Sequence, residues 1–164
     1  MMEDDLAMRR RFDTEGVWDD ELDNKNTALL KTLIATHGWP TIPMVGKKAS
    51  RGAWLITQHA DHDVSFQKKA IGLIKEALVV DPKCIDGANL AYLIDRTRLS
   101  EGKKQIYGTQ FKVTKSGRLK LLPVFNIKKL NILRAAYDLC PIEEILAVAD
   151  KHKQAKAEPS PKKC

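Results

Sequence analysis

Apolar residues recur at helical spacing along most of the chain. Trp18, Leu22, Leu29 and Leu33 share one face of an amphipathic helix predicted over residues 17–36, and Leu30 and Ile34 widen that face. A shorter helix is expected before it, over residues 3–12. The same spacing predicts five further helices, which contain in turn Trp54, Phe66 to Leu78, Leu90 to Ile94, Ile127 to Tyr137, and Ile142 to Ala149. We therefore expect a mainly α protein.

Helix boundaries follow from glycine, proline and capping residues. Residues 38–46 contain two prolines and two glycines, so we expect an ordered loop there rather than a helix. Ser50 is the expected N-cap of the helix around Trp54, and Asp61 or Asp63 is the expected N-cap of the next. Asp86 is placed to cap the one after that.

Beyond Gly102 the pattern changes from helical to alternating. Tyr107, Thr109, Phe111 and Val113 would share one face of a strand, and Ser116-Gly117 supplies a turn before a second strand that ends at Pro123. This predicts one small β-hairpin near residues 104–122. The expected architecture is a single-domain helical bundle over residues 1–150 with this hairpin, followed by a disordered basic tail over 151–164 that carries two prolines.

The composition is that of an ordinary soluble globular protein. The 164 residues are 43% hydrophobic and 30% charged. No apolar run approaches the roughly 18 residues that span a bilayer, and the acidic start lacks the pattern of a signal peptide. We therefore expect a cytoplasmic protein with no membrane partner. The three cysteines lack CxxC spacing, which indicates free thiols rather than a zinc site or a disulfide framework.

The net charge of +7 is unevenly distributed. Residues 1–23 hold nine acidic residues against three arginines, so the rest of the chain is strongly basic. A basic body can favour nucleic acid. However, the lysines are scattered and no basic motif is interleaved with aromatic residues. We interpret them as solvated surface and do not expect a nucleic-acid partner.

Polar residues interrupt the apolar pattern in residues 58–63, just after Trp54, and again at Gln67. Such groups are costly to bury unless they bond one another or a ligand. If the helix continued, His59 would lie beside His62 and Asp63, and an imidazole there could act as a general base or a ligand. The alternative is a core histidine that holds two helices together. Helix capping explains one of Asp61 and Asp63. It does not explain both aspartates together with Gln58 and Gln67, so a direct role of these residues in a ligand site stays open.

A second polar group follows, at Asp95-Arg96 and in residues 102–110. Arg96 could hold a carboxylate or phosphate through its planar guanidinium, or it could form a structural ion pair with Asp95. Glycine inside a strand, as at Tyr107-Gly108, often marks a bulge or a close approach. Gln105, Tyr107 and Thr109 would point to one face, which could meet the His59 region and complete a polar cavity, or else this is an ordinary edge strand with polar side chains.

These residues carry a resemblance to a known family. The chain, from about Asp5 to Leu146, resembles small, mostly bacterial proteins catalogued as a domain of unknown function. The resemblance rests on Gly38-Trp39-Pro40-Thr41, Val45-Gly46, Trp54-Leu55, Gln58-His59-Ala60-Asp61, Asp63, Phe66-Gln67, Ala91-Tyr92-Leu93, Asp95-Arg96, Gly102, Gln105 and Tyr107-Gly108-Thr109-Gln110. His62 lies outside this pattern. The resemblance implies a shared site but no activity.

A metal site can be built from His59, His62 and Asp63, with His37 and Asp95 added. This order resembles the ligands of HD-type metal-dependent phosphohydrolases. The loop after His37 does not provide the helical context of that fold, and His62 is outside the family pattern. We therefore expect no metal and no cofactor.

The leading hypothesis is an enzyme or small-ligand binder that acts on an anionic substrate by acid-base chemistry. The residues expected in catalysis are His59, Asp61, Asp63 and Asp95, and those expected in ligand binding are Gln58, Gln67, Arg96, Gln105, Tyr107 and Gln110. We expect them to converge on one pocket. The first alternative is a non-catalytic interaction or immunity-type protein that binds a protein partner, and the second is the phosphohydrolase.

Overall fold

The computed structural model describes residues 20–115 and 118–151. The chain divides into two compact units, Met1–Asp86 and Gly87–Cys164, and each is described by itself. The predicted helix over residues 3–12, the turn at Ser116-Gly117 and the tail beyond residue 151 lie outside the described residues. The expectation of a single domain up to residue 150 stays a prediction.

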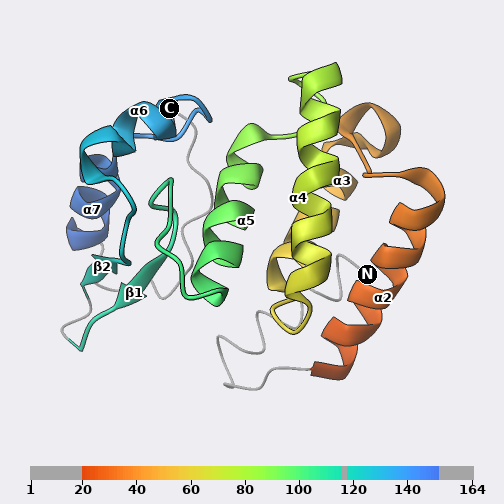
Figure 1. Ribbon diagram of the computed structural model, residues 1–164, viewed down its shortest axis with the longest axis horizontal. Helices are drawn as coiled ribbons and strands as arrows, with labels where there is room; N and C mark the ends of the chain where they lie inside the picture. The colour runs from red at the N-terminus through yellow and green to blue at the C-terminus, as the bar shows by residue number, and fades with distance from the viewer. Residues whose placement is uncertain (1–19, 116–117, 152–164) are drawn as a thin grey trace. The chain divides into compact units, whose positions relative to one another are not determined.

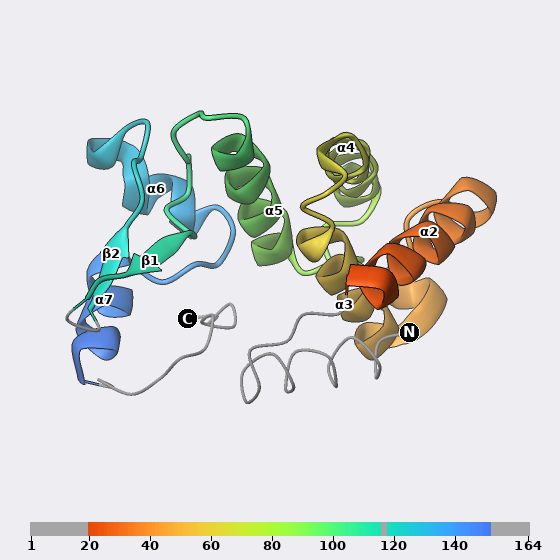
Figure 2. The same ribbon diagram turned by 90° about the horizontal axis from the view of Figure 1, so that it is seen from below.

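Three helices make up the described part of the first unit: α2 (Asp20–His37), α3 (Ile42–His59) and α4 (Val64–Val80). Helix α3 contacts both α2 and α4 (Figure 1, Figure 2). The buried apolar side chains of this unit come from all three helices and from the connections between them, and they include Leu30, Ile34, Trp39, Trp54, Ile56, Phe66, Ala70, Ile74 and Ile85. These side chains form the apolar part of its interior.

The predicted apolar face of α2 is confirmed in part: Leu30 and Ile34 are buried, whereas two other predicted members are exposed. Leu29 and Leu33 are 48% and 42% exposed, whereas the buried face consists of Asp23, Asn26, Thr27, Leu30 and Ile34. These buried positions follow the helical spacing, but the first three are polar. An apolar pattern could not reveal them.

Residues 42–46, the second half of the predicted loop, form the start of a helix, so the prediction is wrong there. Helix α3 begins at Ile42, and Pro43 lies in its first turn. The helix tolerates proline there, because the missing N–H costs no hydrogen bond. The helix is interrupted at Gly46, which has φ +77°, a conformation that favours glycine. Ser50 is therefore buried inside the helix and is not its N-cap, which is Thr41.

The second unit contains α5 (Gly87–Ser100), the strands β1 (Phe111–Val113) and β2 (Leu119–Leu121), a 3₁₀ turn η1 (Ile127–Lys129), α6 (Leu130–Ala135) and α7 (Ile142–Lys151). The strands pair antiparallel, with Lys112 opposite Lys120. Helix α7 contacts β2 (Figure 1). The apolar interior includes Ala88, Ala91 and Leu139, with tyrosine side chains packed against them.

The hairpin is confirmed but is shorter than predicted. Residues 105–110 do not form a strand, and Gly108 has φ +62°. This stretch turns around the side chain of Asp95, and Gln105 makes only an isolated bridge to Val124. In the described residues the fold is thus mainly α with one hairpin, as the sequence predicts.

Two further expectations concern membranes and cysteines. No helix among the described residues is long and apolar enough to cross a membrane. Cys84 is a buried free thiol, as expected. Cys140 is disulfide-bonded, so the expectation of three free thiols is wrong at this position. Spacing along the sequence could not show that pairing.

Candidate functional site

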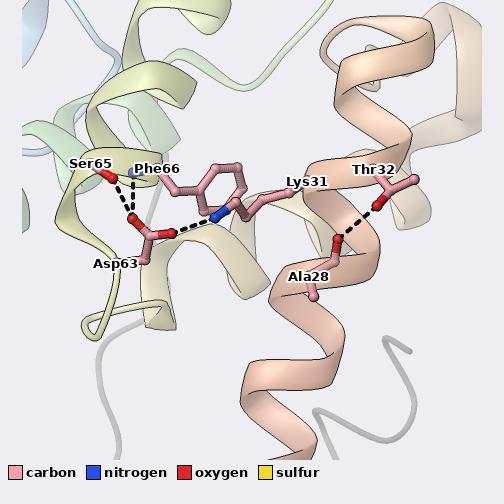
Figure 3. Close-up of polar contacts among 6 residues, drawn as sticks. All are labelled: Ala28, Lys31, Thr32, Asp63, Ser65 and Phe66. Atoms are coloured by element: carbon pink, nitrogen blue, oxygen red, sulfur yellow. Dashed lines mark hydrogen bonds and ion pairs between the residues drawn. The ribbon is translucent and has the colours of Figure 1, made fainter.

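Asp63 connects helix α2 to the start of helix α4. Its Oδ1 accepts hydrogen bonds from the Phe66 backbone N at 2.9 Å and from Ser65 Oγ at 2.6 Å, so it is the N-cap predicted for this helix. Its Oδ2 accepts from Lys31 Nζ at 2.7 Å (Figure 3). The bond from Lys31, followed by those from Ser65 and Phe66, holds the pKa of Asp63 well below its usual range.

The chain leaves the helix immediately after His59. Ala60 is the C-cap of α3, its N–H donates to Ile56 O at 3.1 Å, and the Asp61 N–H turns back to His59 O at 2.8 Å. The condition under which His59 would lie beside His62 and Asp63 on one helical face, a helix that continues past His59, is therefore not met. His62 turns instead toward α2, where its Nδ1 lies 3.5 Å from Asp23 Oδ2.

Gln67 is a fully buried side chain that spans the junction of α3 and α4. Its Nε2 donates to Thr57 O at 3.2 Å, to Gln58 O at 3.2 Å and to Asp61 Oδ1 at 3.3 Å. All three partners are acceptors, so they fix which end of the amide carries the nitrogen. Its Oε1 must then point the other way, where it is buried and has no hydrogen-bond partner.

Among the described residues of this unit, other buried polar atoms without a hydrogen-bond partner include one on α3 and one on α2. They are Gln58 Oε1, at the end of α3, and Thr27 Oγ1, on the buried face of α2. His59, the last residue of α3, is also buried. The amide of Gln67 lies against this end of α3. We call four buried polar residues of α2, α3 and α4 the polar cluster of the first unit. They are Thr27, Gln58, His59 and Gln67.

Asp95 holds the loop of residues 105–110 in the second unit. Its carboxylate is fully buried and accepts from the backbone N–H groups of Ile106 at 2.6 Å, Tyr107 at 3.0 Å and Thr109 at 3.0 Å. The Thr109 hydroxyl donates to it as well, at 3.0 Å. Burial raises the pKa of Asp95, and these four donors oppose that effect. Both oxygens therefore have partners inside the unit.

Gln105 satisfies both ends of its amide within the same loop. Its Nε2 donates to Gln110 O at 3.1 Å and to Leu122 O at 2.7 Å, and its Oε1 accepts from Gln110 N at 3.0 Å. The Gln110 side chain donates in turn to Thr109 Oγ1 at 3.1 Å. These bonds connect the loop to the end of the hairpin.

Arg134 completes this arrangement, although sequence reasoning assigned it no role. It is buried, and it donates to Cys140 O at 2.6 Å, Tyr107 O at 2.8 Å and Gly108 O at 3.0 Å. Its sequence signals are a loose fit to the family resemblance and an arginine among apolar positions of a helix. The ring of Tyr107 packs edge-on against Tyr137 at 4.9 Å, and burial, followed by Tyr137, raises the pKa of Tyr107.

The predicted site residues fall into the two units. Gln58, His59, Asp61, Asp63 and Gln67 belong to the first, and Asp95, Arg96, Gln105, Tyr107 and Gln110 to the second. Within the first unit, Gln67 meets the backbone of Gln58 and the side chain of Asp61, whereas Asp63 bonds to α2. Arg96 is half-buried. Convergence of all ten residues on one pocket stays a prediction.

The predicted metal site requires histidine and aspartate side chains that lie close together. Within residues 20–115 and 118–151, no three His, Cys, Asp or Glu side chains lie close enough together to hold one metal ion. The combination of His59, His62 and Asp63 that motivated the phosphohydrolase alternative is thus not assembled there.

Comparison with known proteins gives a family but no activity. A family model described as a family of unknown function (DUF6624) matches residues 1–157. No curated protein matches the chain, and no solved structure does. The resemblance to a family of unknown function is confirmed, and any function has to be argued from the residues themselves.

Proposed function

Since the chain belongs to this family of unknown function, we propose from its residues that the first unit binds a small polar ligand at the junction of α3 and α4. The polar cluster of Thr27, Gln58, His59 and Gln67 would contact the ligand. His59 would exchange a proton with it, because an imidazole can gain or lose a proton near neutral pH.

One observation carries this proposal: the carbonyl oxygen of Gln67 is buried, fixed in orientation and without a donor. An unsatisfied buried acceptor costs about 1–3 kcal/mol, and native proteins keep few of them. Gln58 Oε1, nine residues earlier, is also buried and without a donor. A ligand that donates to both oxygens would remove these costs, which explains why the glutamines are kept in an interior that apolar side chains could fill.

The second unit supports a different role for its polar residues. Asp95, Gln105 and Arg134 already have several partners each, all within the unit. A saturated network of this kind stabilises a loop and leaves little for a ligand. We therefore propose that these residues shape the surface of the second unit. That is also what the alternative of a non-catalytic interaction protein requires.

The test is native mass spectrometry on the full chain, purified without denaturation. The proposal expects an additional small mass on the wild-type protein that the Gln58→Met variant lacks. His59→Asn, which keeps similar size and one hydrogen-bonding group, should fold normally and should also lose or weaken that mass. A wild-type spectrum without added mass, together with a large loss of stability in His59→Asn, would instead show that His59 is a structural residue.

A further inference from the structure

We infer that the ligand of the first unit presents N–H donors on a neutral or positively charged group, of the amide, amidine or amine class, rather than a phosphate or a carboxylate. This inference rests on the proposed function and specifies its ligand. It departs from the expectation of an anionic ligand, which came from the sequence alone.

The first argument is the chemistry of the unsatisfied atoms. Gln58 Oε1 and Gln67 Oε1 are carbonyl oxygens, which can only accept hydrogen bonds. The three acceptors around Gln67 Nε2 exclude the reversed amide, so this end cannot become a donor. Thr27 Oγ1 can either donate or accept. A phosphate or carboxylate would bring further acceptors against these carbonyl oxygens.

The second argument is the distribution of charge. In residues 20–86, every lysine and arginine is exposed, whereas the carboxylate of Asp23 is buried on the same face of α2 as Thr27. A desolvated anion needs a buried cation or several donors. The described part of the unit offers no buried lysine or arginine for that purpose, so His59 would be the one basic side chain of the polar cluster. A neutral or cationic donor meets a more favourable environment near Asp23.

Three small molecules of the same shape separate these ligand classes. Acetamidinium carries only donors, acetamide carries a donor and an acceptor, and acetate carries only acceptors. Each is titrated into the ¹⁵N-labelled full chain at constant ionic strength, and the backbone amides of residues 58–63 and the side-chain NH₂ of Gln67 are followed by NMR. We expect saturable shifts with acetamidinium and acetamide, and binding of acetate weaker by about tenfold or more, the effect of one mismatched buried hydrogen bond.

Variants locate the binding. Gln58→Met, which replaces the amide with an apolar side chain of similar length, should weaken the binding of acetamidinium by about tenfold. Thr27→Val provides a second change of nearly the same shape on α2, and a comparable loss is expected. Gln110→Met, a matched change in the second unit, should leave the titration unchanged.

The outcomes distinguish the inference from the proposed function. Saturable binding of acetate alone at residues 58–67 would overturn the donor inference and leave a small-ligand site in place. If none of the three molecules shifts these resonances, both are overturned, because the buried oxygens are then satisfied by water alone. Binding of the donor molecules that Gln110→Met also removes would place the site elsewhere and refute the inference.

Discussion

Among the described residues, three buried glutamines differ in how many of their side-chain hydrogen bonds are made. Replacing each by methionine should therefore change the free energy of unfolding by a different amount. Gln105 is satisfied at both ends, Gln67 only at its nitrogen, and the oxygen of Gln58 has no partner. Methionine is close to glutamine in length and fills the same space without polar atoms. The stability of each variant therefore reports on the hydrogen bonds and little on packing.

The expected magnitudes follow from the bonds lost. Gln58→Met removes a buried acceptor that has no donor, so it should stabilise the ligand-free first unit by about 1–2 kcal/mol. Gln67→Met loses three donations but also removes an unsatisfied oxygen, and we expect a net destabilisation of about 1–2 kcal/mol. Gln105→Met leaves two carbonyls and one N–H without their partner and should destabilise the second unit by about 3–5 kcal/mol.

The chain supplies its own spectroscopic probes for this experiment. All three tryptophans, Trp18, Trp39 and Trp54, belong to the first unit, and all three tyrosines, Tyr92, Tyr107 and Tyr137, belong to the second. Urea unfolding followed by tryptophan emission therefore reports the first unit, and the tyrosine ring resonances in ¹H NMR spectra of the same samples report the second. In a unit of this size, 1 kcal/mol corresponds to roughly 4–8 °C in melting temperature.

One result would refute the reasoning about the polar cluster. If Gln58→Met destabilises the first unit by more than about 1 kcal/mol, its oxygen has a donor in the ligand-free protein, such as an ordered water. The argument for a donor-bearing ligand would then lose half of its support. A destabilising Gln105→Met in the same series shows that the assay can detect a satisfied amide.

Further predictions concern single residues. The folded-state pKa of Asp63 is depressed, so its charge stabilises the protein above the unfolded-state pKa of about 3.9. This contribution is lost as the pH falls toward the folded-state pKa. In urea titrations, the stability advantage of wild type over Asp63→Asn at pH 7 should therefore shrink below about pH 4. Asp95→Asn places an NH₂ group against backbone donors and should cost about 2–4 kcal/mol by tyrosine-detected unfolding. Gly108→Ala should melt at a lower temperature than Gly46→Ala: both have positive φ, but only at Gly108 would a Cβ lie 3.2 Å from Leu130 Cδ1.

The fold class could be predicted because helical periodicity survives in most elements. Helical periodicity of apolar residues failed to identify the buried face where polar residues occupy the interior. The buried face of α2 begins with Asp23, Asn26 and Thr27, so counting apolar residues selected the exposed Leu29 and Leu33 together with the buried Leu30 and Ile34. Residues 105–110 alternate like a strand, but the N–H groups of Ile106, Tyr107 and Thr109 bind the Asp95 carboxylate instead of a neighbouring strand. Alternation along the sequence cannot show which acceptor a backbone N–H will meet.

The same reasoning identified polar residues that are indeed buried, among them Gln58, His59, Gln67, Asp95 and Gln105. It could not separate satisfied from unsatisfied groups, because that depends on partners up to 17 residues away, as between Gln105 and Leu122. Arg134 was missed because nothing near it in sequence indicates the carbonyls of Tyr107 and Gly108 that it binds. The proton chemistry expected of His59 stays a prediction.

The carboxylate of Asp95 also determines how the second unit opens in its native state. The N–H groups of Ile106, Tyr107 and Thr109 share this one acceptor, so none of them is released to solvent independently of the others. In native-state hydrogen exchange, amides that are freed by one opening event show one opening free energy. The amides of Ile106, Tyr107 and Thr109 should therefore show one common opening free energy, as the amides of a single cooperative segment do.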